Sequence, residues 1–170
     1  PIVYASLPTD PAKESLIKIC AGDMIANVKV RNDGAVLQSV LQNDIAVCPT
    51  NTHAPLFRLC LRRPDGEIVR LSSTSGWERV VCSRLSDVVR LEFSRATSCS
   101  VLTAILTAEC FAEHDRIEWK LQLDFGGNNA WEMDSAVVGE IPVAAYEDCA
   151  LFYPKGEGAV LENVFECRPS

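Results

Sequence analysis

Alternation of apolar and polar residues dominates the chain and predicts β-strands. From Ile117 to Phe125 every second residue is apolar, and the residues between them are charged or carry an amide. A period of two is typical of an antiparallel strand with one face on a core and the other in solvent. The same alternation over residues 56–62, with Phe57, Leu59 and Leu61 apolar, predicts a second strand of this kind.

Turn signals divide the rest of the chain into short strands. Asn32-Asp33-Gly34 joins predicted strands over 24–31 and 35–41, and Pro64-Asp65-Gly66 joins 56–62 to 67–71. Asp and Gly favour these positions because they tolerate the backbone angles of tight turns. Further strands are predicted over 80–83, 88–93, 136–143, 150–153 and 159–165, and residues 101–112 fit either a helix or a strand.

One helix is predicted near the start of the chain. Asp10 can cap free backbone N–H groups and Pro11 suits the first helical turn, so we expect a helix over residues 11–20. The whole pattern has no alternation of strands with helices and no fixed repeat. It predicts a mainly β protein: an antiparallel β-sandwich or open barrel of about nine strands with one or two short helices. We expect one domain over 1–170, with residues 1–22 as a helical extension.

Composition and charge narrow the functional classes. No stretch is long and apolar enough for a transmembrane helix, and Pro1–Lys13 lacks a signal-peptide pattern. The net charge of −7 argues against nucleic acid as a partner. Yet residues 57–95 hold eight arginines and five acidic residues, whereas residues 107–170 hold 13 acidic and four basic residues, a balance of +3 against −9. Such asymmetry selects and orients protein partners. The residues expected to contact a protein partner are Arg58, Arg62, Arg63 and Arg70.

A second hypothesis is carbohydrate binding. Trp131 follows the turn Gly126-Gly127-Asn128-Asn129, and Trp77 follows Ser75-Gly76. An indole at a loop edge offers a flat apolar surface to a sugar ring, and neighbouring amides bind its hydroxyls. The residues expected to bind a glycan are Trp131, Asn128, Asn129 and Trp77. The segment 115–134 resembles the final strands of starch- and glycogen-binding modules, and to the same degree a stretch of the prenyl-binding delta-subunit sandwiches, so it assigns no family.

The third hypothesis is an enzyme that depends on cysteine and histidine. The chain has eight cysteines, none in a C-x-x-C pair, and two histidines. Cys110 and His114 are four residues apart and would share a face if residues 101–112 formed a helix. Phosphate-binding glycine loops and zinc-protease motifs do not occur, so we expect no cofactor and no metal. The missing N-x-S/T sequon favours an intracellular over an extracellular location, although it leaves the compartment open.

These observations rank the functions. A non-enzymatic module that binds a protein partner through a β-sandwich surface fits best, because the charge asymmetry supports it and no catalytic motif occurs. A carbohydrate-binding module that uses the tryptophans and a Cys/His enzyme are the alternatives.

Overall fold

The fold is built almost entirely of antiparallel strands. The computed structural model describes residues 14–48, 52–97, 100–126 and 131–142, together with the backbone of 5–6, 150–153 and 159–162. The one helical element in these ranges is a single turn of 3-10 helix, η1 (Ala112–His114). The mainly β, antiparallel fold expected from the sequence is confirmed.

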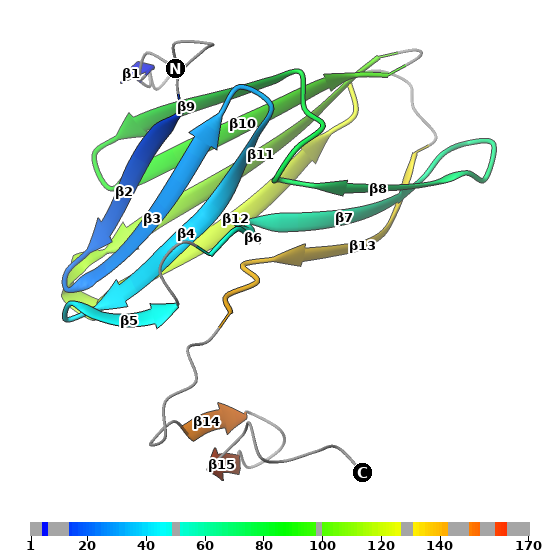
Figure 1. The fold of residues 1–170 in the computed structure, drawn as a ribbon. Coiled ribbons are helices and arrows are strands. Elements are labelled where there is room, and N and C mark those ends of the chain that lie inside the picture. Colours follow the sequence, from blue (N-terminus) through cyan, green and yellow to red (C-terminus); the bar gives the residue numbers. More distant parts are fainter. Residues whose placement is uncertain are drawn as a thin grey trace.

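Three sheets make up the body of the molecule (Figure 1). The first sheet has the order β1 (Ala5–Ser6), β9 (Arg79–Leu85), β10 (Val88–Ala96), β11 (Val101–Phe111) and β12 (Arg116–Asp124). The second has the order β2 (Ser15–Ala21), β3 (Met24–Arg31), β4 (Gly34–Gln42) and β5 (Ile45–Cys48), and β6 (Ala54–Pro55) also pairs with β4. The third has the order β13 (Glu132–Val138), β7 (Phe57–Arg62) and β8 (Ile68–Ser72). Two further strands, β14 (Ala150–Tyr153) and β15 (Ala159–Glu162), pair only with each other.

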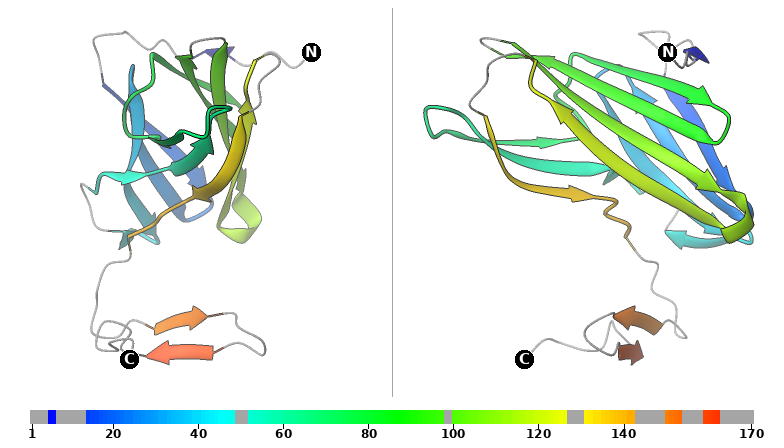
Figure 2. Two further views of the ribbon diagram at one scale, coloured as in Figure 1. Left: turned by 90° about the vertical axis from the view of Figure 1, so that its right-hand side faces the viewer. Right: turned by 180° about the vertical axis from the view of Figure 1, so that it is seen from behind.

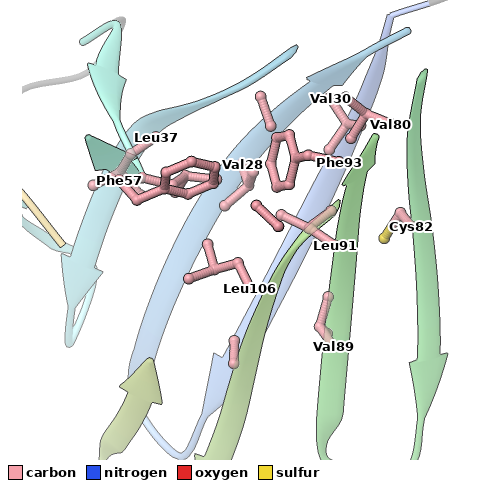
Figure 3. Close-up of a cluster of buried hydrophobic side chains, with 14 of the residues drawn as sticks. Val28, Val30, Leu37, Phe57, Val80, Cys82, Val89, Leu91, Phe93 and Leu106 are labelled. Carbon is pink, nitrogen blue, oxygen red and sulfur yellow. The ribbon is translucent and has the colours of Figure 1, made fainter. Parts of the chain in front are cut away.

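One hydrophobic core lies between these three sheets. The first and second sheets face each other, and the third lies across one end of the pair (Figures 1 and 2). Figure 3 shows how side chains of all three sheets meet: Val28 from the second, Leu91 and Phe93 from the first and Phe57 from the third. The alternation seen in the sequence follows directly, since Phe57, Leu59 and Leu61 are buried while the residues between them are not.

An aromatic cluster fills the end of the core beneath the third sheet. The rings of Phe57 and Phe93 meet edge to face with centroids 5.0 Å apart, and Trp77 lies 5.9 Å from Phe57 and 5.4 Å from Phe93. Edge-to-face pairs contribute about 0.5–1.5 kcal/mol beyond the burial of their area. The indole N–H of Trp77 donates to the backbone oxygen of Ser72 at 2.8 Å, so the ring is buried without an unsatisfied polar atom.

A buried serine joins the third sheet to the second. The hydroxyl of Ser73 donates to the carbonyl of Ala35 at 2.9 Å and accepts the amide of Leu56 at 2.8 Å. The backbone passes so close that a Cβ on Gly34 would lie 2.3 Å from the carbonyl oxygen of Thr74. Glycine is therefore required at this contact, which fixes the position of β7 and β8 relative to β4.

The predicted helix over residues 11–20 is wrong wherever the structure describes it. Residues 15–21 form β2, in which Ile17, Ile19 and Ala21 face inward while Leu16 and the residues alternating with it face out. The predicted helical extension over 1–22 therefore contains a paired strand of the second sheet, and residues 11–13 lie outside the described ranges. The ambiguous stretch 101–112 is mostly strand β11, which pairs with both β10 and β12.

β12 and β13 follow each other along the chain, but no ladder of hydrogen bonds joins these two edge strands. β12 pairs with β11 and β13 pairs with β7, and neither is paired with the other. In the sheets, β13 is the neighbour of β7 and not of β12. Because β12 and β13 stay apart, the sandwich is open along this line.

Candidate functional site

The four predicted partner-binding arginines all lie on the β7–β8 hairpin. Arg58 and Arg62 are on the outer face of β7, Arg63 begins the turn, and Arg70 is on β8. The register places Cys60 opposite Arg70 on this face. Alternation thus brings Arg58 and Arg70 together on the outer face of the third sheet.

Ion pairs divide these arginines into two kinds. Arg62 donates through two guanidinium nitrogens to Asp134, with its closest contact at 3.0 Å, and Arg63 pairs with Glu67 across the turn. Arg58 pairs with Glu140 at 2.8 Å. Arg70 has no acidic partner among the residues that the structure describes. Of these four arginines, Arg70 is therefore the one that no described carboxylate neutralises.

A concave basic surface surrounds Arg70. A groove of about 560 Å³ is lined by Arg58, Arg70 and His53 together with hydroxyl-bearing and apolar residues, most of them from the third sheet. Its other lining residues are Pro55, Leu59, Cys60, Leu71, Ser72, Thr74, Ser135 and Val137. Among the described residues no carboxylate lines it, although the chain carries seven more acidic than basic residues. We call this surface the basic groove.

The tryptophans do not lie at the exposed positions that the carbohydrate hypothesis expected. Trp77 is only 4% exposed and belongs to the aromatic cluster, so the prediction that it forms a ligand platform is wrong. Trp131 is half-buried: its ring stacks on Phe125 with centroids 6.3 Å apart, and the Arg63 guanidinium carbon lies 5.5 Å from its centroid. A sugar would need ring surface that these two residues already cover. Asn128 and Asn129 lie outside the described residues.

The helix that would have brought Cys110 and His114 onto one face does not form. Cys110 lies in strand β11 and His114 in η1, so the two do not share a helix face. Burial raises the pKa of the Cys110 thiol, and the nearby Arg84 offsets this only in part. A raised pKa reduces the thiolate fraction and hence the nucleophilicity. The described cysteines 20, 48, 60, 82 and 110 are all free thiols, and no group of metal-binding side chains forms among the described residues.

The opening between β12 and β13 is a feature that sequence reasoning missed. An apolar groove of about 390 Å³ is lined by alternate residues of both strands, and an apolar cavity of about 220 Å³ lies next to it along β12. The groove is lined by Leu121, Leu123, Phe125, Met133, Ala136 and Val138. The strand alternation predicted that Ile117, Trp119 and the next apolar residues of β12 face inward, but only topology shows that the partner strand is missing there.

Comparisons with known proteins do not add to this picture. The chain matches no family model, no curated protein and no solved structure. Within the described residues, no helix has the length and apolar character needed to cross a membrane. Functional inference therefore rests on the basic groove and the apolar opening themselves.

Proposed function

We propose that this chain is a non-enzymatic binding module that captures a protein partner through an acidic segment in the basic groove. The observation that carries the proposal is the lining of that groove, where Arg70 has no acidic partner among the described residues and lies beside His53 and the Glu140-paired Arg58, in a chain of net charge −7. The positive potential of the groove attracts an acidic ligand, whereas the net negative charge of the rest of the chain repels it.

The shape of the groove favours an extended segment. Its floor is the outer face of a sheet, where side chains alternate, and β8 is an edge strand paired with β7 along its length. An edge strand offers unpaired backbone groups to an added strand. An extended peptide beside β8 would place a carboxylate next to Arg70 on the outer face, where guanidinium and carboxylate pair through two hydrogen bonds.

The test is a binding titration with a defined probe. A fluorescein-labelled peptide of alternating Glu and Val is titrated with the protein, and a Lys-Val peptide serves as the charge control. We expect saturable binding of the acidic peptide, and binding that weakens as salt rises. Arg70→Glu should weaken it by about ten-fold or more, since a hydrogen bond between charged groups contributes about 1.5 kcal/mol or more.

The matched control is Arg79→Glu, which makes the same charge change at an exposed position on β9, outside the groove. It should change the affinity by less than the groove variant does. Equal losses in the two variants would mean that only net charge matters, and the proposal would be wrong.

A further inference from the structure

We infer that the opening between β12 and β13 binds the hydrocarbon chain of a fatty acid. This site is separate from the basic groove, because the two share only the strand β13 and the segment at Pro55.

The cavity lies between two layers of the sandwich. Met24, Ala26, Leu37 and Val40 line it from the second sheet, and Trp119 is among the residues that line it from β12. A peptide strand added to the edge of β12 would lie in the plane of the sheet. If it entered the space between the layers, its backbone N–H and C=O groups would lose water without gaining partners. A hydrocarbon chain has no such groups and can enter.

The cavity and the groove follow one row of side chains. Ile117 and Trp119 line the cavity, and the groove is lined by the next inward-facing residues of β12 and by Phe125, which directly follows the strand. On the opposite side the lining passes from Val138 to the adjoining Gly139. From Ile117 to Phe125 a strand extends about 26 Å, at roughly 3.3 Å per residue. The apolar path is therefore long and narrow, which suits an extended chain better than a compact ring system.

Large apolar side chains stay exposed along this path. Met133 is 56% exposed and Ile141 43%. Contiguous exposed apolar surface on a protein usually marks a binding site. A dry, apolar cavity of about 150 Å³ already suffices to bind an apolar molecule, and this cavity is about 220 Å³.

The charged residues at one end of the cavity are already paired, so the carboxylate of the fatty acid would stay in water while its hydrocarbon chain enters the apolar lining. Asp115 and Arg116 are the charged residues of the lining. Asp115 already accepts the backbone amide of Asp23 at 2.7 Å. Arg116 pairs with Glu118 at 3.0 Å, and its side chain is 53% exposed. The Arg116 guanidinium carbon also lies 4.5 Å from the ring centroid of Phe111, and Arg116 alternates along β12 with the cavity-lining Ile117 and Trp119, so its charge belongs to the outer face of the sheet.

The experiment uses cis-parinaric acid, which fluoresces when it enters an apolar site, titrated into the whole chain below its micellar concentration. We expect saturable binding of one molecule per chain and energy transfer from tryptophan. Ile141→Trp should block the opening and weaken binding about ten-fold or more; because Ile141 is exposed, this variant should fold normally. Ala26→Leu, which fills the cavity from the opposite sheet, should have the same effect.

Two controls keep the result specific. Ile45→Trp changes an exposed isoleucine on β5 that lines neither the cavity nor the groove, and it should leave the affinity unchanged. Arg116→Gln, on the outer face of β12, should also leave the affinity unchanged. The inference is overturned if the acid does not saturate, if Ile141→Trp binds like the unmodified chain, or if Ile45→Trp weakens binding as much as Ile141→Trp does.

Discussion

The two sides of β13 border surfaces of opposite character. On the outer side, Ser135 and Val137 line the basic groove with Arg58 and Arg70. On the other side, Ala136 and Val138 line the apolar groove with the inward row of β12. One exposed edge strand thus separates a charged surface from an apolar one. The charged surface follows from the alternation of side chains along β7, β8 and β13. The apolar surface exists because β12 and β13, the edge strands of two different sheets, do not pair with each other.

The largest effect should come from the core that supports both surfaces. Phe57→Ala removes a fully buried ring that contacts Trp77 and Phe93, so we expect the free energy of unfolding to fall by about 3–5 kcal/mol. Urea unfolding would measure the change. Both probes, the acidic peptide and parinaric acid, should then bind less well. If one surface kept full affinity in this variant, the two would not share a structural support.

High pH should destabilise the fold through the buried Cys82 of β9. Burial raises the pKa of the Cys82 thiol to about 11, from an ordinary value of 9.0. As pH rises from 9 to 11, the unfolded chain releases this proton while the folded chain retains it, so stability is lost. The loss should reach about 2 kcal/mol by pH 11, since one pKa unit corresponds to 1.36 kcal/mol. Urea unfolding between pH 8 and pH 11 should show a smaller loss in Cys82→Ala. Parallel curves for the two proteins would contradict the assignment.

Removal of the serine that joins the second and third sheets should act mainly on the basic groove. Ser73→Ala leaves the Leu56 amide and the Ala35 carbonyl without the hydroxyl that bonds both, so we expect a loss of about 1–3 kcal/mol. Ser94→Ala is the control, because the Ser94 hydroxyl makes only a 3.5 Å contact with the carbonyl of Arg79. Binding of the acidic peptide should weaken more than that of parinaric acid, and equal losses would argue against this separation.

The smallest effect concerns Trp131. Arg63→Ala removes the guanidinium near its ring and should cost less than about 1 kcal/mol, because both groups are partly exposed. Acrylamide should then quench the tryptophan fluorescence more strongly. Arg62→Ala removes a neighbouring arginine that pairs with Asp134 instead, and it should leave quenching unchanged. Equal quenching in both variants would show that Arg63 does not cover the ring.

Strands with a clear period of two were predictable, and this determined most of the fold. The strand predicted over 24–31 matches β3, and the one predicted over 56–62 differs from β7 by one residue. The helix predicted over 11–20 is wrong because the local helix-start signal of Asp10-Pro11 was given more weight than the alternation of Ile17, Ile19 and Ala21. That alternation is short, and its meaning becomes clear only from the sheet that β2 joins.

The candidate sites were only half predictable. The arginines of β7 and β8 could be placed on one face from their spacing, but their partners could not, since Asp134 and Glu140 lie more than 70 residues away from Arg62 and Arg58. Trp77 follows a turn and looked exposed, yet its N–H finds the carbonyl of Ser72 and the ring enters the core. The apolar opening depends on which strands are edges, a property of the whole topology rather than of any local stretch.

We propose that β13 separates two binding surfaces of different chemistry. The most direct test is a ¹H–¹⁵N NMR titration of one labelled sample, first with the Glu-Val peptide and then with parinaric acid. We predict that the peptide shifts amides of β7 and β8 around Cys60, Arg70 and Ser72, and that the fatty acid shifts the indole N–H of Trp119 and the amides of Leu121 and Val138. If both probes shifted the same residues, or neither probe shifted its own set, the account would be contradicted.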